Sequence, residues 1–303
     1  MRIRFGTMSA MSACRLLVRR TLLDIPGFHK HAEIVPGVSV ARWSNQEADS
    51  KPKLLYVPGL ESSGLNLYAH AEHLSHTFDV HSVVIDPSYK NDFHELSKSI
   101  SDYVEATRLP HLLIGESFGA AVTLAVYQNL KRDSDLITAL GLINSVTAFE
   151  SSHWPDKMDE IINDWNLCRI VKIIAEHSPS GCEMVKLVCK LANSHGAHAE
   201  VHYAMLVNMS TMPSGLLQHR VMSWIGDAAI ATKTGLLDNI KVPVLIIAGR
   251  RDLFLPSEQE AYRLNSLIPM GQIHLLDCGH MITEQLEPVI VPWFKMLKTL
   301  KTL

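Results

Sequence analysis

The chain has 303 residues, of which 47% are hydrophobic and 19% charged, a balance that excludes a disordered or fibrous protein and indicates a large buried core. Its 28 Lys and Arg residues against 31 Asp and Glu residues give a formal net charge of -3, which provides no electrostatic reason for a nucleic-acid partner. The five cysteines are scattered and form no CxxC pair, so we expect reduced thiols in an intracellular compartment.

The N-terminal segment, residues 1–33, is predicted to lie outside the core. Its first 23 residues carry five arginines and no acidic residue, a composition typical of organelle transit peptides, although a frayed basic terminus is the alternative. We therefore expect a cytoplasmic protein or, if the segment is a transit peptide, a plastid or mitochondrial one. No apolar run approaches the roughly 18 residues that a membrane span needs, which leaves only peripheral membrane contact open.

The elements that follow predict an α/β protein. Residues 33–44 partly alternate apolar and polar side chains, which indicates an edge strand or hairpin interrupted by Pro36 and Gly37. Short apolar runs of the kind buried on both faces of a parallel sheet occur at residues 54–57, 80–85, 112–114, 139–143, 244–247 and 273–276. Helical segments, residues 65–74 and 93–107, separate the first three runs. The order predicts a mostly parallel central sheet flanked by helices.

A long gap interrupts these strands. Residues 148–230 contain no strand-like apolar run, and apolar residues recur at helical spacing, as at Ile170, Ile173 and Ile174. We interpret this stretch as a helical cap inserted into a core formed by residues 34–147 and 231–303. The cap is expected to form an acyl pocket from adaptable apolar side chains, for which the candidates are Trp154, Trp165, Met184, Leu187 and Met205.

The sharpest motif is Gly-Glu-Ser-Phe-Gly at residues 115–119, between the strand ending at residue 114 and the helical run 120–130. At a tight strand-to-helix turn the serine hydroxyl is exposed, and flanking glycines avoid collisions with neighbouring backbone. The following helix brings free N–H groups and its positive dipole end beside the serine. A glycine-rich turn with an incidental serine is the alternative, but this context favours Ser117 as a nucleophile.

A serine nucleophile needs a base, and position selects one histidine among 16. Where a GxSxG turn carries the nucleophile, the acid and then the histidine follow along the chain, on loops after late strands. His280 follows the strand 273–276, and residues 281–285 predict the start of a helix. His280 therefore fits the general base, with a satisfied loop histidine as the alternative.

The acid that orients this histidine is expected after the preceding strand. Asp252 follows residues 244–247 through a short turn, where a carboxylate can accept the second imidazole N–H. A salt bridge with the neighbouring arginines is the alternative interpretation of Asp252. Asp277 and Glu258 are weaker candidates for the same role.

An oxyanion hole requires two backbone N–H groups. The residue after the nucleophile, Phe118, supplies the first. The loop Val-Pro-Gly-Leu-Glu-Ser-Ser-Gly at residues 57–64 follows an early strand, and its glycines allow the Leu60 N–H to point inward. Glu61 is the weaker alternative donor.

Together these residues resemble the α/β-hydrolase superfamily over residues 34–297, and its esterase, lipase and acyltransferase branch that includes plant phytyl ester synthases. The segments that carry the resemblance are VPGLESSGLNLYAHAEHL, GESFGAAVTLAV, VPVLIIAGRRDLFLPSEQEAYRL and CGHMITEQ. The resemblance implies acyl-ester chemistry on lipidic substrates, carried by Ser117, Asp252 and His280. The paired Arg250 and Arg251 depart from its pattern, in which a single basic residue precedes the acid.

The predicted function is a serine hydrolase that forms an acyl-enzyme at Ser117 from a carboxylic, lipidic ester and uses no cofactor. No motif specifies an alcohol acceptor, so hydrolysis is favoured over acyl transfer. A C–C bond hydrolase and a non-catalytic ligand-binding protein on the same fold are further alternatives. The sequence specifies neither the acyl-chain length nor the oligomeric state.

Two histidine clusters are candidate metal sites: His70, His73, His76, and His195, His198, His202. Neither contains an HExxH pattern, and the first rotates around a helix at steps of three residues. We therefore expect solvated or pH-sensitive surfaces and no metal site.

Overall fold

The computed structural model describes residues 28–43, 51–130, 134–147, 216, 219–232, 234–252, 255–282 and 286–300. Residues 1–27 and most of the predicted cap lie outside the described residues. The same holds for all five candidate pocket residues, Trp154, Trp165, Met184, Leu187 and Met205. The expectation that the N-terminal segment lies outside the core was wrong for residues 28–33, since Phe28 is buried and β1 begins at His29. Residues 1–27, the cap and its pocket stay predictions.

The core is one eight-stranded sheet with the order β1-β2-β4-β3-β5-β6-β7-β8. The strands are β1 (His29–Val35), β2 (Val38–Arg42), β3 (Lys53–Val57), β4 (Asp79–Ile85), β5 (His111–Glu116), β6 (Ile137–Ile143), β7 (Val244–Gly249) and β8 (Gly271–Leu276). β1 and β2 form the predicted hairpin at one edge, and β2 pairs antiparallel with β4. All later pairs are parallel, so the predicted mostly parallel sheet is confirmed.

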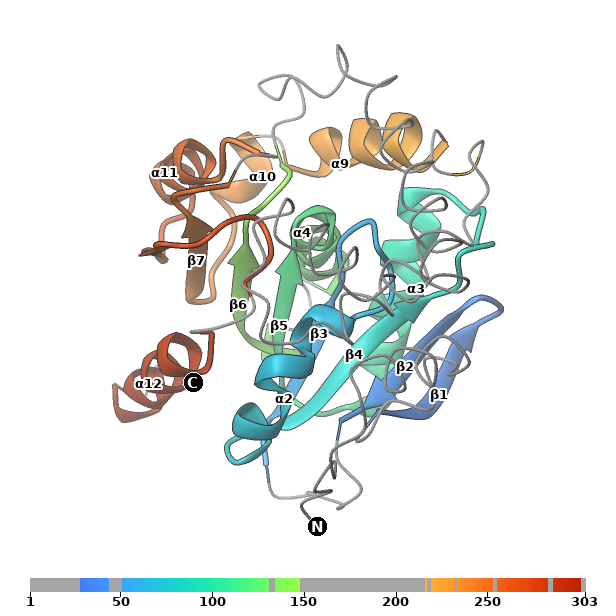
Figure 1. The fold of residues 1–303 in the computed structure, drawn as a ribbon, viewed down its shortest axis with the longest axis horizontal. Helices are drawn as coiled ribbons and strands as arrows, with labels where there is room; N and C mark the ends of the chain where they lie inside the picture. The colour runs from blue at the N-terminus through green and yellow to red at the C-terminus, as the bar shows by residue number, and fades with distance from the viewer. Residues whose placement is uncertain are drawn as a thin grey trace, which may run out of the picture.

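Helices cover both faces of the sheet (Figure 1). They are η2 (Leu65–Leu67), α2 (Tyr68–Ser75), α3 (Phe93–Thr107), α4 (Phe118–Leu130), η3 (Ser134–Leu136), η6 (Arg220–Trp224), α9 (Ile225–Ala231), α10 (Thr234–Leu237), α11 (Ser257–Leu267) and α12 (Leu286–Thr299). The predicted helix at residues 93–107 matches α3, which begins with a capping box between Asp92 and Glu95.

Two apolar cores explain this arrangement. One core joins β-strand residues to α3, α4, α9 and α11, and the other joins the opposite faces of the strands to α2 and α12. All six residues of β5 and of β7 are buried, as expected for central strands covered on both faces. α4 lies in the middle of the first core and is buried nearly all round, which explains its apolar sequence.

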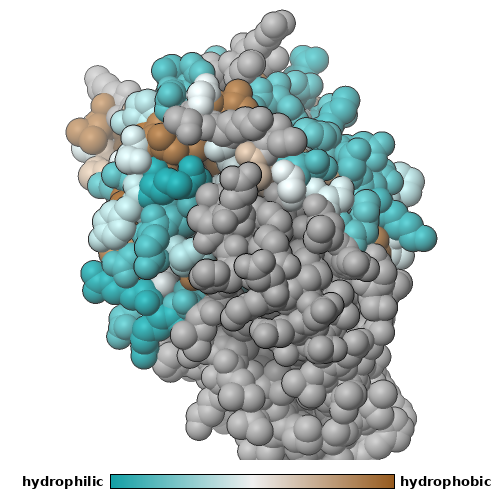
Figure 2. Space-filling view, turned by 90° about the horizontal axis from the view of Figure 1, so that it is seen from above, coloured by the Kyte–Doolittle hydropathy of each residue, from teal (hydrophilic) through white to brown (hydrophobic). Residues whose placement is uncertain are grey.

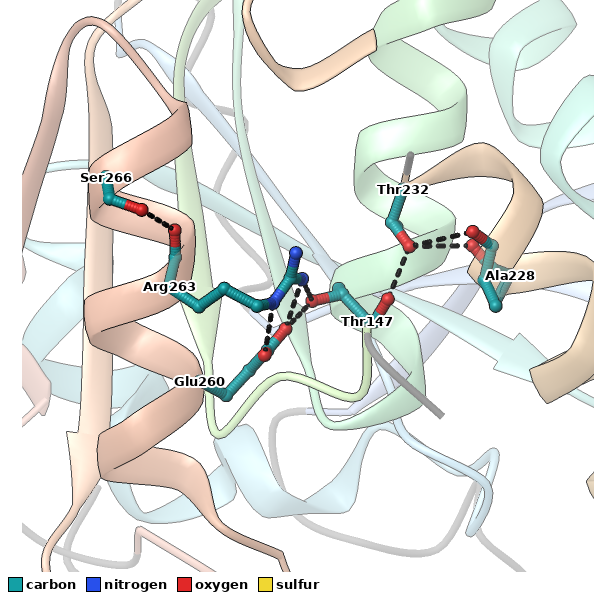
Figure 3. A network of polar contacts seen from close by, with 7 residues as sticks. Thr147, Ala228, Thr232, Glu260, Arg263 and Ser266 are labelled. Carbon is teal, nitrogen blue, oxygen red and sulfur yellow. Dashed lines mark hydrogen bonds and ion pairs between the residues drawn. The ribbon is translucent and has the colours of Figure 1, made fainter. Parts of the chain in front are cut away.

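The parallel strands end at one edge of the sheet, and the loops at that edge carry the predicted site residues. The chain enters the predicted insertion after Thr147 and returns through η6 and α9. Figure 3 shows how the two ends meet: the Thr232 hydroxyl bonds the Thr147 carbonyl, and the Thr147 side chain contacts Glu260 and Arg263 on α11. This polar network fixes both ends of the insertion to the core.

The surface seen from above, over the carboxyl ends of the strands, is largely hydrophilic where it is described, with small separate apolar areas (Figure 2). Among the described residues, no helix combines the length and the apolar character of a membrane span.

Candidate active site

Ser117 is the single residue between β5 and α4, and its backbone is left-handed with φ 56°. A non-glycine residue in this region is strained and persists only where surrounding contacts hold it. Two backbone hydrogen bonds do so: the Ser117 N–H donates to the Ile143 carbonyl at 2.8 Å, and its carbonyl accepts from the Val146 N–H at 3.1 Å. Strand β6 and the loop after it therefore hold the serine turn in place.

The two flanking glycines are required by close backbone contacts. A Cβ at Gly119 would overlap the carbonyl oxygen of Val57, and a Cβ at Gly115 would overlap the carbonyl of Gly119. The first turn of α4 can therefore lie directly against β3 only because both positions lack a side chain. This packing places the N-terminus of α4 beside the Ser117 hydroxyl.

The structure brings Ser117, His280 and Asp252 together from three separate loops. The His280 Nε2 atom lies 3.2 Å from the Ser117 Oγ, and its Nδ1 lies 2.7 Å from the Asp252 Oδ2. The carboxylate of Asp252 also accepts a hydrogen bond from the Leu255 N–H at 3.1 Å and another from the Ser257 hydroxyl. These bonds fix the carboxylate, which in turn fixes the imidazole ring.

The two weaker acid candidates occupy other positions. Arg251 Nε pairs with the Asp277 carboxylate at 2.9 Å, and Arg250 Nε lies 4.0 Å from Glu258. All four side chains of these pairs are substantially exposed. The arginine pair that departs from the family pattern thus contacts Asp277 and Glu258, whereas Asp252 contacts His280.

Charge and burial act in opposite directions on the pKa values of this pair. Burial disfavours the imidazolium form of His280, but the hydrogen bond and charge of Asp252 and the charge of Glu116 outweigh burial and raise the His280 pKa. Burial likewise opposes the charged form of Asp252, and the charge and hydrogen bond of His280 lower its pKa overall. The arrangement favours a carboxylate beside an imidazole that readily accepts a proton.

Glu116, next to the serine, is a buried carboxyl group that the sequence analysis did not single out. It accepts hydrogen bonds from the Tyr56 hydroxyl and from the Asn66 side-chain amide, the latter at 3.2 Å. Burial raises the pKa of Glu116 to about 7 against these hydrogen bonds and the charge of His280. The protonation state of Glu116 therefore changes near neutral pH.

The expected second oxyanion loop follows β3 and lies against the serine. A Cβ built on Gly59 would be 3.2 Å from the Ser117 Cβ, and Leu60 is the next residue. The Ser62 N–H donates to the Gly59 carbonyl at 3.0 Å, and the Ser62 hydroxyl donates to the Leu60 carbonyl at 3.0 Å. The side chain of Glu61 accepts the N–H groups of residues 63 and 64. The loop is thus a closed, hydrogen-bonded turn.

Sequence reasoning also missed Asn144, which follows β6. Its side-chain amide donates to the His280 carbonyl at 2.6 Å and accepts the Gly249 N–H at 2.8 Å, so it joins the ends of β6, β7 and the histidine loop. The predicted helix start at residues 281–285 was wrong for Met281 and Ile282. Both precede α12, and the Ile282 carbonyl contacts His70 Nε2 at 2.9 Å.

Arg220 and Trp224 on η6 were missed too, although an Arg-x-x-x-Trp spacing on a helix is a signal for a stacked pair. Arg220 lies over the Trp224 ring at 4.5 Å, and that ring stacks on Phe118 at 5.2 Å.

The described part of the chain contains no group of three His, Cys, Asp or Glu residues placed to hold a metal ion. In the first histidine cluster, the expected solvated surface was wrong for His70, which is buried and whose ring contacts a backbone carbonyl. The rings of His73 and His76 pack edge to face. The second cluster, His195, His198 and His202, lies outside the described residues.

Comparison with known proteins extends this description. Residues 52–285 match the family model of the alpha/beta hydrolase fold. Phytyl ester synthase 1, chloroplastic, of Arabidopsis thaliana is 26% identical over 261 residues, which cover 77% of this chain and 35% of that protein. Phytyl ester synthase 2, chloroplastic, of the same plant is 24% identical over 258 residues, covering 76% and 35%. The chain thus spans about a third of the length of these relatives.

Solved structures share the fold at low identity. A candidate lipase from Acinetobacter baumannii AYE superposes with a TM-score of 0.70 at 18% identity, over 97% of this chain and 98% of that one.

Proposed function

The chain belongs to the alpha/beta hydrolase fold family, and from that premise we propose that it cleaves carboxylic esters through an acyl-enzyme formed on Ser117. One observation carries the proposal. The hydroxyl of a serine held in a left-handed turn lies 3.2 Å from an imidazole nitrogen, and the other nitrogen of that ring lies 2.7 Å from a buried carboxylate. Esters with lipidic acyl chains are the proposed substrate class, which the names of the relatives support.

In the proposed first step, the Ser117 Oγ attacks the ester carbonyl carbon while His280 Nε2 takes its proton. Asp252 stabilises the imidazolium and keeps Nε2 directed at the serine. The tetrahedral intermediate collapses as His280 gives the proton to the departing alcohol, and the acyl group stays on Ser117. In the second step His280 removes a proton from water, which attacks the acyl-enzyme and releases the acid.

The negative charge of the intermediate is proposed to lie between the backbone N–H groups of Phe118 and Leu60. Phe118 begins α4, so its N–H has no partner within the helix and lies at the positive end of the helix dipole. Leu60 follows Gly59, which packs against Ser117. Donors fixed before the reaction stabilise the transition state without reorganisation.

Acyl transfer is a second candidate, because both curated relatives are named as synthases of phytyl esters. In that reaction an alcohol replaces water in the second step, with His280 as its base. An alcohol competes with water at about 55 M only when it is bound at high effective molarity. The names of the relatives also support a plastid location for this chain.

The proposal is tested by product analysis. Purified chain is given a long-chain p-nitrophenyl ester, alone and with micromolar long-chain alcohol or diacylglycerol, and the products are separated. We expect free fatty acid to form in both cases and to vanish with Ser117→Ala, since that variant lacks the attacking oxygen. Undiminished turnover by a folded Ser117→Ala variant would reject the proposal. New ester in excess of free acid would make acyl transfer the main reaction.

A further inference from the structure

Arg220, the first residue of η6, is a cation buried in the core, and no carboxylate of the described residues is among its hydrogen-bond acceptors. Its side chain donates to the Ser62 hydroxyl at 2.8 Å, to the Asp86 carbonyl at 2.9 Å and to the Tyr89 carbonyl at 3.2 Å. Its exposed fraction is 0%. Burial lowers the pKa of Arg220 to about 10, so the side chain stays charged at neutral pH. Burying a charge whose hydrogen-bond acceptors are neutral costs free energy.

The first contact leads to the oxyanion loop. Ser62 lies in the left-handed region with φ 70°, and its hydroxyl accepts from Arg220 while donating to the Leu60 carbonyl. The Ser62 N–H holds the Gly59 carbonyl. Because the Gly59 carbonyl and the Leu60 N–H share one planar peptide, fixing the carbonyl also fixes the direction of that N–H. Arg220 thus supports, through one hydroxyl, the turn that presents the Leu60 N–H.

Arg220 also contacts the Trp224 ring, which connects it to the other side of the serine. The Arg220 guanidinium lies 4.5 Å from the centre of the Trp224 ring, and this ring stacks on Phe118 at 5.2 Å with planes 17° apart. The Trp224 indole N–H is held by the Asn91 carbonyl at 2.8 Å. Arg220, Trp224 and Phe118 therefore form one buried stack, whose last member starts α4.

We propose that Arg220 is a positioning residue for the oxyanion hole, which it holds from both sides: the Leu60 N–H through Ser62, and the Phe118 N–H through Trp224. The inference rests on the proposed function of Ser117. The inference adds that η6, which follows residues 148–219 in the chain, completes the catalytic geometry of the core. Loss of Arg220 should weaken stabilisation of the oxyanion and leave binding of the ester nearly unchanged.

The test compares kcat and KM per active site in wild type, Arg220→Met and Arg220→Lys. Sites are counted by complete reaction with a fluorophosphonate, so that unfolded molecules do not enter the rate. Removal of one oxyanion donor in known hydrolases lowers kcat about 10²- to 10³-fold, so misalignment of two donors should lower it at least about tenfold. KM should change less than about threefold, because ground-state binding does not use the hole. Arg220→Lys should recover part of the loss.

A transition-state analogue gives a readout that a purely structural role would not move. A trifluoromethyl ketone adds to the serine and places an oxyanion in the hole, so its inhibition constant should weaken in parallel with kcat. Ser62→Ala, which breaks only the loop side, should show a smaller loss of the same kind. If Arg220→Met does not fold, the kcat and ketone inhibition of Ser62→Ala still test the proposal.

Arg42→Met is the matched control. Arg42 is also mostly buried and bonds a carboxylate, Asp79, at 2.8 Å, but Asp79 begins β4 at the opposite end of the strands from Ser117. This variant should lose stability and keep kcat per titrated site.

Two outcomes would overturn the inference. If the Arg220 and Ser62 variants reduced only the number of titratable sites, with kcat per site and ketone inhibition as in wild type, both residues would be structural anchors alone. If the wild-type chain neither reacted with the fluorophosphonate nor cleaved esters, the proposed function itself would fail and the inference with it. The two failures are distinguished by the wild-type measurement.

Discussion

At the scale of single residues, the pair of Glu116 and His280 shows how burial sets the chemistry near the serine. Glu116 is held by the neutral groups of Tyr56 and Asn66, and its charge raises the pKa of His280. The proposed reaction needs a neutral His280 to accept the serine proton. The charge on Glu116 therefore moves the pH at which the base becomes available.

Glu116→Gln should shift the acid limb of the kcat/KM profile to lower pH. Removing the negative charge that Glu116 carries above its pKa of about 7 lowers the His280 pKa, so the neutral imidazole persists to more acidic pH. The profile is measured from pH 5 to 9 with a soluble ester. Glu105→Gln, at an exposed position on α3, is the control and should leave the limb in place. A limb that stayed fixed or moved to higher pH in Glu116→Gln would contradict this reasoning.

The sequence pointed to Ser117, Asp252 and His280, and the structure brings these three side chains together. Their order along the chain and their places after strands depend on topology, which local patterns reveal. The roles of Glu116, Asn144 and Arg220 depend on which buried atoms face each other across the fold. No pattern in one sequence encodes such distant pairings directly.

At the scale of elements, the site depends on the carboxyl ends of β6, β7 and β8 staying in register. Asn144, left-handed with φ 43°, connects them through the Gly249 N–H and the His280 carbonyl. The central strands were predictable because they are buried on both faces, whereas β8 alternates partly buried and exposed residues. The start of α12 was not, because the contact of the Ile282 carbonyl with His70 joins residues far apart in the sequence.

Asn144→Ala should lower both stability and activity. It leaves two buried backbone groups without their partner, at a cost of roughly 1–3 kcal/mol each, and frees the loop that carries His280. Urea unfolding and kcat per titrated site measure the two effects. Asn239→Ala provides the comparison: Asn239 is exposed, its side chain donates to the Gly235 carbonyl, and its loss should change stability by less than about 0.5 kcal/mol. An Asn144→Ala variant as active as wild type would show that the bridge is dispensable for positioning the base.

At the scale of the whole molecule, the two ends of the strands carry different chemistry. The carboxyl ends hold the candidate active site, whereas the opposite ends hold buried ionisable groups with structural effects. Asp79 bonds Arg42 and Lys53 there, and nearby His111 is buried at the start of β5. Burial lowers the pKa of His111 to about 4, so the folded protein keeps this side chain neutral below pH 6.5.

The contribution of His111 to the free energy of unfolding should therefore fall as the pH decreases from about 6.5 toward 4, whereas Glu116, with its raised pKa, contributes in the opposite direction. In this pH window the unfolded chain binds a proton at His111, whereas the folded chain does not. The loss at pH 5 amounts to about 2 kcal/mol relative to pH 7.5. Between pH 7.5 and pH 5, urea unfolding should show that His111→Gln gains stability relative to wild type. His29→Gln, at an exposed position on β1, should behave as wild type; equal changes in all three proteins would refute the assignment to His111.

The central claim, a covalent acyl group on Ser117, is tested most directly by acid quenching the reaction with a p-nitrophenyl ester within milliseconds and measuring the protein mass. The account predicts one added acyl group per chain, located by peptide analysis on Ser117 and absent from Ser117→Ala. Cys278 provides an internal comparison, because burial raises the pKa of its thiol to about 11 and leaves little thiolate to react. Ester turnover with no acylated protein at any time, or with the acyl group on a residue other than Ser117, would contradict the account.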